Sequence, residues 1–127
     1  LNVKLKISRG DRIAIIMQNC PQFIISYYAI LGINCVIVPV NPMLQVDEIS
    51  FILRDSNIKA IFAASDILNT VDTALKKINC ISIPIISINY LDYIKKRFNV
   101  KLPKEFKNNC NNKNNIRKKK MERYSRI

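Results

Sequence analysis

Residues 10–42 restrict the possible folds most strongly, because they read as an apolar strand, an apolar helix and a second apolar strand. Two parallel strands cannot be joined by a tight turn, so this order is typical of a crossover unit of about 30 residues. The expected strands, 13–17 and 35–38, are continuous apolar runs. Such runs indicate strands buried on both faces, as in parallel sheets. The stretch therefore predicts an α/β fold.

The helix between these strands is expected to begin at Pro21 and to end near Leu31. Proline suits the first helical position, where its missing N–H has no intrahelical partner. Gly32 follows at the place where a left-handed residue commonly ends a helix. Residues 23–31 are nearly all apolar, and a helix facing solvent would show a polar side. We expect this helix to lie between layers, or under protein that this chain does not supply.

The same alternation of strands and helices continues to about residue 98. It predicts a mainly parallel sheet with helices on both faces. The later elements are expected to be a helix over 47–56 with Asp47 and Glu48 in its first turn and Asn57 as its left-handed cap, a strand over 59–63, a helix over 67–78 capped by Ser65, a strand over 81–88 interrupted by Pro84, and a short helix over 90–98.

The formal net charge of +12 is concentrated near the C-terminus. Residues 1–100 hold 11 Lys and Arg against 7 Asp and Glu, whereas residues 101–127 hold 10 against 2. Residues 108–120 are mostly Asn, Lys and Arg, and they carry too few apolar side chains to offset the entropy of ordering. We therefore divide the chain into a partial α/β subdomain over 1–106 and a disordered basic tail over 107–127.

Several classes of chemistry are disfavoured by the composition. The chain has no histidine, and its two glycines, Gly10 and Gly32, are too far apart to form a glycine-rich phosphate loop. Its four cysteines form no Cys-x-x-Cys pair, so buried reduced thiols in the cytoplasm are expected. Charges interrupt the N-terminal residues and no apolar run approaches 20 residues, so neither a signal peptide nor a membrane span is predicted. The four cysteines are Cys20, Cys35, Cys80 and Cys110.

Three local patterns could form functional sites, but each also fits a simpler structural role. Asp47 and Glu48 suit the positive end of a helix better than acid–base catalysis. Tyr27 and Tyr28 fit a packed core better than a ligand tunnel. The turn at 40–42 lies at the carboxyl end of a strand, where open α/β sheets place ligands, although a plain turn is favoured.

The basic tail offers a fourth pattern, since clustered Lys and Arg can contact phosphates. No aromatic stacking platform or groove-reading helix accompanies it, so a solvated tail or translated non-homologous sequence is favoured. The residues concerned are Arg117, Lys118, Lys119, Lys120, Arg123 and Arg126.

The sequence resembles the N-terminal part of AMP-forming acyl-CoA synthetases, within the adenylate-forming superfamily. The resemblance covers about 105 residues and ends near Asn108. Cys20 stands where the family commonly has Ser or Thr. The matching segments are Gly10-Asp11-Arg12-Ile13-Ala14-Ile15, Gln18-Asn19-Cys20-Pro21-Gln22-Phe23, Tyr28-Ala29-Ile30-Leu31, Val38-Pro39-Val40-Asn41-Pro42-Met43, Asp55-Ser56-Asn57-Ile58-Lys59-Ala60 and, loosely, Tyr90 to Phe106.

The resemblance implies that the sheet is part of a larger N-terminal domain, and that the chain is a fragment of an ATP-dependent fatty-acid–CoA ligase that supplies scaffold and part of the acyl pocket. The complete enzyme would use ATP, Mg²⁺, CoA and a carboxylic acid. The family's Ser/Thr/Gly-rich phosphate loop, its ATP-ribose aspartate and its catalytic C-terminal lysine have no counterpart here. We therefore expect no catalytic, cofactor-binding or metal-binding residue in this chain, and no ATP–pyrophosphate exchange by the chain alone.

Two other hypotheses stay open. The chain could be a small non-enzymatic α/β module whose basic tail binds RNA or an anionic membrane, with affinity that falls steeply as salt rises. It could also be the product of a decayed gene, with an exposed apolar surface that promotes aggregation.

Overall fold

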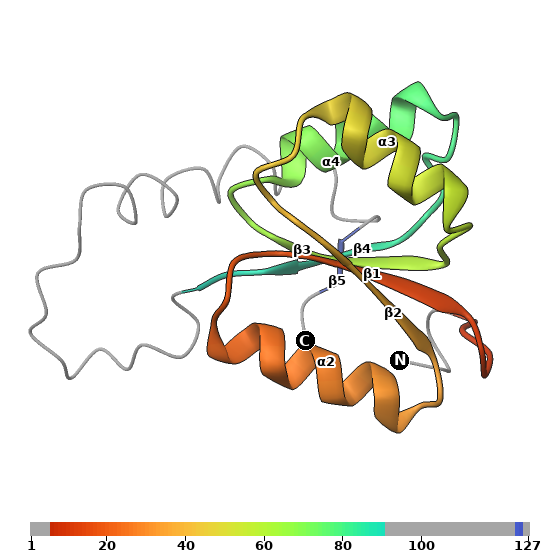
Figure 1. The fold of residues 1–127 in the computed structure, drawn as a ribbon, viewed down its shortest axis with the longest axis vertical. Helices are drawn as coiled ribbons and strands as arrows, with labels where there is room; N and C mark the ends of the chain where they lie inside the picture. The colour runs from red at the N-terminus through yellow and green to blue at the C-terminus, as the bar shows by residue number, and fades with distance from the viewer. Residues whose placement is uncertain (1–5, 91–123, 126–127) are drawn as a thin grey trace, which may run out of the picture.

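The computed structural model describes residues 6–90 and 124–125 of the 127-residue chain. In the part described, one parallel sheet carries helices on both faces (Figure 1), which confirms the expected α/β class. The elements are β1 (Arg12–Ile16), α2 (Pro21–Gly32), β2 (Val36–Val40), α3 (Val46–Asp55), β3 (Ala60–Ala64), α4 (Leu68–Lys77), β4 (Ile85–Ile88) and β5 (Tyr124–Ser125).

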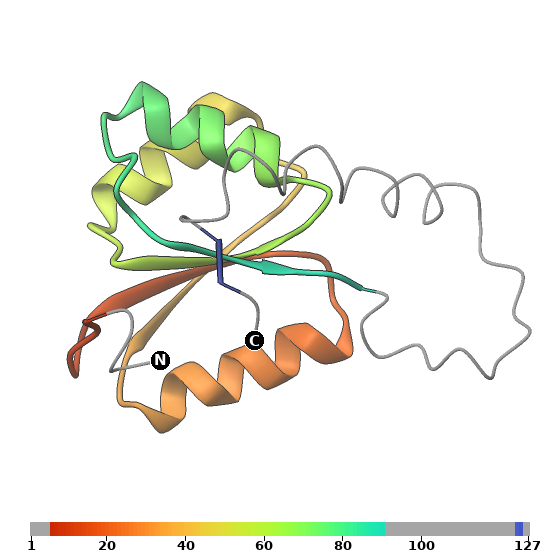
Figure 2. The ribbon, with the colours of Figure 1, turned by 180° about the vertical axis from the view of Figure 1, so that it is seen from behind.

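The strand order β2-β1-β3-β4-β5 explains where the helices lie. The chain steps from β1 to β2 in one direction, crosses back to β3 on the other side of β1, and continues to β4. Crossovers between parallel strands are almost always right-handed, so a reversal of direction moves the connecting helix to the opposite face. Figures 1 and 2 accordingly show α2 on one face of the sheet and α3 with α4 on the other.

Two apolar clusters fill the spaces between the sheet and its helices. One packs Ala14, Ile61 and Ile85 of the strands against α3 and α4, and the other packs Ile15 and Phe62 against α2. All five residues of β3 are buried, because β3 has a strand on each side and helices above and below. The central strand therefore behaves as its continuous apolar run predicts.

Two predicted helix caps are wrong. Gly32 remains inside α2, and Asn34, two residues later, takes the left-handed conformation with φ of 56°. Ser65 does not cap α4, because that helix begins after Ile67 and has no side-chain cap. The backbone N–H of Ser65 instead donates to the Ile88 carbonyl at 2.8 Å, which extends the pairing of β3 with β4.

The second strand is less buried than its sequence predicts. β2 lies at the edge of the sheet, where Val36 is 49% exposed and Pro39 is exposed.

The fourth strand is shorter than expected, since β4 begins directly after Pro84. Tyr124 and Ser125, from the segment expected to be disordered, pair with β4 as β5. The rest of 107–127 and residues 91–98 of the expected short helix lie outside the described residues.

Candidate functional site

The strand order places a topological switch point beside β1, whose two neighbours β2 and β3 are reached by helices on opposite faces. Open α/β sheets bind ligands at the carboxyl ends of the strands at such points. Polar side chains follow β1 and β3 at this end of the sheet. We call Gln18, Cys20, Gln22, Asp66 and Tyr90 the switch-point cluster.

Tyr90 joins the end of β4 to the turn that follows β1. The backbone N–H of Gln18 donates to Tyr90 Oη at 3.0 Å. The buried side chain of Gln22 donates through Nε2 to the carbonyls of Asn89 and Tyr90, at 3.4 and 3.2 Å. Residues about 70 positions apart are thereby held together at the carboxyl end of the sheet, as the separations of 72, 67 and 68 residues show.

The surroundings of Tyr90 favour its neutral form. Burial raises the pKa of its hydroxyl above the ordinary value of 10.0, and Asp66 and Cys20 raise it further, while the hydrogen bond from the Gln18 N–H lowers it. At neutral pH the hydroxyl is therefore protonated. It accepts one hydrogen bond from the backbone and can also donate one.

The chemistry available to the switch-point cluster is polar binding. It holds a phenol, an amide, a thiol and a carboxylate, but the chain has no histidine to act as base for a nucleophile. Among the described residues, no group of three or more Cys, Asp or Glu side chains is placed to hold a metal ion. The cluster can therefore orient the chain ends or a polar ligand, and we assign it no bond-breaking step.

The turn at 40–42 uses its polar side chain internally. Asn41 Oδ1 accepts the backbone N–H of Met43 at 2.9 Å, and the Asn41 carbonyl accepts the N–H of Leu44 at 3.2 Å. This is an Asx turn, in which the side chain satisfies the local backbone. The geometry supports a plain turn here, at the end of the edge strand β2.

The acidic pair at the start of α3 also has structural partners. Glu48 accepts the backbone N–H of Gln45 at 2.8 Å in a capping box, and Asp47 pairs with Lys77 of α4 at 2.5 Å. Both carboxylates lie in the first turn, where the helix dipole favours negative charge.

The two tyrosines of α2 differ in burial. Tyr27 packs partly buried against the core, as expected, but Tyr28 is 67% exposed, so the core assignment of Tyr28 is wrong.

Among the cysteines, Cys35 is buried, Cys20 and Cys80 are partly buried, and all three are free thiols. The Cys35 thiol donates to the Ser8 carbonyl at 3.3 Å, and burial followed by the charge of Asp11 raises its pKa. Cys110 lies outside the described residues.

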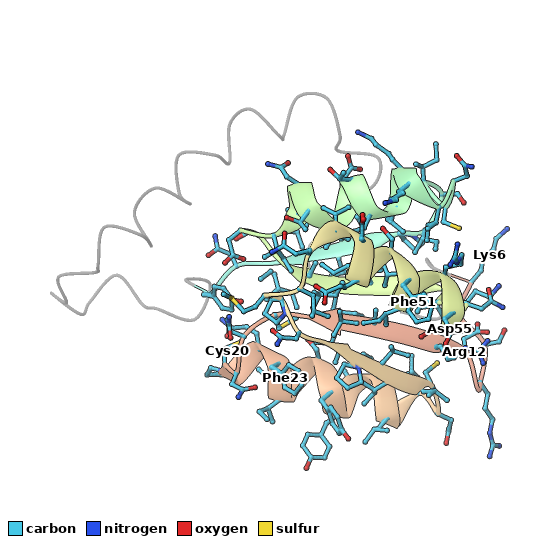
Figure 3. All side chains as sticks on the ribbon, turned by 45° about the horizontal axis from the view of Figure 1, so that its top comes forward. Lys6, Arg12, Cys20, Phe23, Phe51 and Asp55 are labelled. Carbon is cyan, nitrogen blue, oxygen red and sulfur yellow. The ribbon has the colours of Figure 1, made fainter. Side chains whose placement is uncertain are left out.

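Residues 10–12 connect neighbouring elements through hydrogen bonds. Gly10 adopts φ of 84° and its N–H donates to the Asn34 carbonyl at 2.8 Å, while Asp11 accepts the N–H of Ser8 at 2.8 Å. The Nε of Arg12 donates to the Ser56 carbonyl at the end of α3. Figure 3 shows Arg12 beside Asp55, at the opposite end of the molecule from Cys20 and Phe23. These residues therefore hold neighbouring elements together, and they are not placed to position a reacting group.

The basic residues of the tail, from Arg117 to Arg126, lie outside the described residues, so RNA or membrane binding stays a prediction. Within 6–90 and 124–125 no helix has the length and apolar character needed to cross a membrane.

The switch-point cluster was not identified from the sequence. Finding it requires the strand order and the contact between residues 18 and 90, and both depend on pairing between distant segments. The one available signal was the apolar run of β4 ending in Asn89-Tyr90, because polar and aromatic residues after a parallel strand lie at the edge where ligands bind.

Comparison with known proteins identifies a family that matches most of the chain. A family model described as AMP-binding enzyme matches residues 1–118, about ten residues further than the resemblance seen by inspection, so the expected end near Asn108 is too early. The long-chain-fatty-acid–CoA ligase of Bacillus subtilis (strain 168) is 38% identical over 55 residues, which are 43% of this chain and 10% of the ligase.

Solved structures of similar fold are also much longer than this chain. A putative long-chain-fatty-acid CoA ligase from Rhodopseudomonas palustris CGA009 superposes with a TM-score of 0.58 at 27% identity, over 72% of this chain and 25% of that one. A benzoate CoA ligase from Burkholderia xenovorans LB400 superposes with a TM-score of 0.64 at 21% identity, over 71% and 18%, and supports the fold alone. The chain spans about a tenth of the length of the curated relatives that it matches.

Proposed function

The chain belongs to the AMP-binding enzyme family, as its resemblance to the N-terminal part of AMP-forming acyl-CoA synthetases predicted, and from this membership we propose that it forms one α/β segment of an ATP-dependent, AMP-forming fatty-acid–CoA ligase. In the complete enzyme, the carboxylate would become an acyl adenylate and then a CoA thioester. The segment would contribute scaffold and a wall of the acyl pocket.

The observation that carries the proposal is the family match over 118 residues. The fatty-acid class is supported by relatives named long-chain-fatty-acid–CoA ligases in Bacillus subtilis and Mycobacterium tuberculosis, at 38% and 40% identity. The segment's own architecture fits a scaffold, since the residues at 10–12 connect three elements through backbone carbonyls.

The described residues do not fit a site for ATP, Mg²⁺ or CoA. Gly10 serves a turn and Gly32 lies within a helix, so neither belongs to a loop that could enclose a phosphate. Among the described carboxylates, Glu48 caps a helix, Asp47 and Asp72 pair with lysines, and Asp11 accepts a backbone N–H. We therefore propose that the nucleotide and metal chemistry is supplied by other parts of the enzyme, and we assign no catalytic residue here.

The test is to replace, in the Bacillus subtilis ligase, the segment that the family model aligns with residues 1–118 by these residues, and to assay acyl-CoA and AMP formation from a long-chain fatty acid. We expect the replaced ligase to be active. The control carries Phe62→Ala in the central strand, which removes a fully buried ring at a cost of about 3–5 kcal/mol and should abolish activity. Failure of the replaced ligase to form acyl-CoA would contradict the proposal.

A second measurement concerns the chain by itself. Residues 1–127 should not catalyse carboxylate-dependent exchange of pyrophosphate into ATP, because the groups that the described residues place at the switch point include no metal site and no histidine base. Exchange above the level of a heat-inactivated sample would show that this chain holds nucleotide chemistry of its own.

A further inference from the structure

The fourth strand has one neighbour that is far away in the sequence. On one side β4 pairs with β3, and on the other side Ile85 and Ile86 pair in parallel with Tyr124 and Ser125 of β5. Residues 89–123 connect the two strands, and they are more than the roughly one dozen residues that a parallel connection needs. The outer side of β4 therefore accepts a strand from the C-terminal end of the same chain.

The hydrogen bonds between β3 and β4 show which backbone groups of β4 point outward. The carbonyls of Pro84 and Ile88 accept N–H groups from β3 and from the residue after it, at 3.0 and 2.8 Å. Because backbone groups alternate between the two sides of a strand, those of Ile85 and Ser87 point to the outer side. Outward N–H and C=O groups of this kind are a template for pairing with another strand.

The same alternation gives the orientation of β5. In a parallel ladder, only one of two register partners directs its backbone groups toward the other strand. Ile86 directs its groups toward β3, so its register partner Ser125 is the residue of β5 whose N–H and C=O face β4. The backbone groups of Tyr124 point away from β4 by the same reasoning.

The burial of β4 follows the extent of this pairing. Ile85 and Ile86, which pair with β5, are 2% and 1% exposed, whereas Ser87 and Ile88 are only half-buried. At the opposite edge, β2 has no strand outside it in the part described, and Val36 is 49% exposed. The strand from the C-terminal residues thus lies along the most buried part of the β4 edge.

The sequence around β5 suits a strand that ends a sheet. β5 has two residues, and Arg123 and Arg126 stand directly beside it in a stretch, 117–126, that holds six Lys and Arg against one Glu. Very short edge strands, charged side chains and prolines are the devices by which proteins keep sheet edges from pairing with other chains. The opposite edge strand, β2, contains Pro39. Both edges therefore carry features that oppose pairing between copies.

We propose that residues 119–127 act as an intramolecular edge strand, which binds the outer side of β4 and keeps it from accepting a strand of another protein. The family model ends at residue 118, so β5 lies beyond the part of the chain on which the ligase proposal rests. The inference is therefore independent of the proposed function. It gives the basic C-terminal residues the role of protecting a sheet edge.

Hydrogen exchange of backbone amides in the chain 1–127, followed by NMR, tests the pairing. Ser125→Pro removes the N–H that faces β4, so exchange at the outward N–H of Ser87 should become about tenfold faster or more. Tyr124→Pro is the matched control, because it removes an N–H that points away from β4, and exchange at Ser87 should stay unchanged. Exchange at Phe62 in the central strand should stay slow in both variants, because the sheet remains folded.

Sedimentation velocity over a concentration series tests the protective role. Ser125→Pro frees the outer side of β4 and should increase self-association, whereas Tyr124→Pro should not. Replacing both flanking arginines, Arg123→Gln with Arg126→Gln, lowers the repulsion between copies but keeps the backbone of β5. This double variant should associate more than the unaltered chain while exchange at Ser87 stays slow.

Four results would overturn the inference. Unchanged exchange at Ser87 in Ser125→Pro would mean that β5 does not hold the β4 edge. Protection of Ser87 that disappears on dilution would identify the strand as one from a second copy. Faster exchange at Phe62 as well would mean that β5 supports the whole sheet. Faster exchange at Ser87 without any increase in association would remove the protective role.

Discussion

Three asparagines end the three described helices in the left-handed conformation: Asn34, Asn57 and Asn79, with φ of 56°, 46° and 55°. At α2, the N–H of Asn34 donates to the Leu31 carbonyl and that of Cys35 to the Ile30 carbonyl, at 2.8 and 3.2 Å. This pair of bonds is the Schellman motif, and α4 repeats it with Asn79 and Cys80.

The motif explains two of the cysteines. An apolar residue after the left-handed position usually contacts the last turn of the helix, and Cys35 and Cys80 occupy that place. Cys35 shares one apolar cluster with Ile30, and Cys80 packs against the other, which contains Leu75. These thiols therefore act as small apolar side chains, as the sequence predicted for cysteines beside apolar runs.

The left-handed conformation of Asn34 gives a prediction about stability. Asn34→Ala should lower the free energy of unfolding by about 1 kcal/mol, because a Cβ without a local polar group is disfavoured there. Asn34→Gly should leave stability unchanged or raise it, since glycine adopts positive φ without strain. Urea denaturation measures both. As a control, Asn69→Ala in the exposed surface of α4 should be neutral or slightly stabilising, because alanine favours a helix.

The raised pKa of Tyr90 gives a prediction about alkaline pH. A group with a higher pKa in the folded state keeps its full contribution below the unfolded pKa, and loses it as pH rises toward the folded value. For Tyr90 that loss starts near the ordinary value of 10.0. The free energy of unfolding should therefore fall as the pH rises above about 10, and Tyr90→Phe should weaken that dependence. An unchanged alkaline slope in Tyr90→Phe would show that other groups cause it.

At the scale of elements, the sequence predicted what depends on local pattern. The apolar runs gave the strands and the three- and four-residue spacing gave α3 and α4 to within a few residues, because burial imposes those periods directly. The two failed caps, Gly32 and Ser65, show the limit. Asn34, not Gly32, takes the left-handed position before β2, and Ser65 extends the pairing of β3 with β4 instead of capping α4. Each helix boundary therefore depends on how the adjacent strand lies in the sheet, which is not a local property.

The second strand shows the same limit for burial. Its apolar run predicts a strand covered on both sides, but β2 is at an edge because the chain crosses back over β1 to form β3. The N–H of Val36 donates to the Asp11 carbonyl, so alternate residues of β2 point their backbone groups toward β1 and the others point outward. By this alternation Pro39 lies at an outward position, where its missing N–H weakens any further strand pairing.

The position of Pro39 leads to a prediction about association. Pro39→Val supplies an outward N–H on an exposed apolar edge, so it should increase self-association at high protein concentration. Analytical ultracentrifugation over a concentration series measures the effect. Pro42→Ala changes a proline in the turn after β2, outside the ladder, and should leave the association unchanged. Equal behaviour of the two variants would mean that the β2 edge does not govern association.

At the scale of the whole molecule, the candidate site depends on topology more than on motif. The family-like segment at 10–12 can be recognised in the sequence, and its residues connect neighbouring elements through hydrogen bonds. Gln18, Gln22 and Tyr90 carry no recognisable spacing, because they meet only after β1, β3 and β4 have paired. A sequence predicts such a site only to the extent that it predicts strand order.

The distribution of charge separates the ligase-segment proposal from the RNA or membrane hypothesis. Residues 108–127 hold seven Lys and Arg against one Glu, so their removal lowers the net charge from +12 to +6. The uncharged stretch at 13–46 gives the folded part no basic surface over α2 and β2. Any strong attraction to phosphates must therefore come mainly from the C-terminal residues.

Deletion of residues 108–127 is the corresponding experiment. If the chain serves as a ligase segment, the full chain and the truncated chain should both bind RNA weakly at physiological salt. Any binding that either shows at low salt should decrease as the salt concentration rises. Fluorescence anisotropy with a short RNA, repeated across salt concentrations, measures this. Tight binding at physiological salt that disappears on deletion would favour the RNA hypothesis. The loss of two residues of β5 should cost little stability, because so short an edge strand adds few contacts to β4.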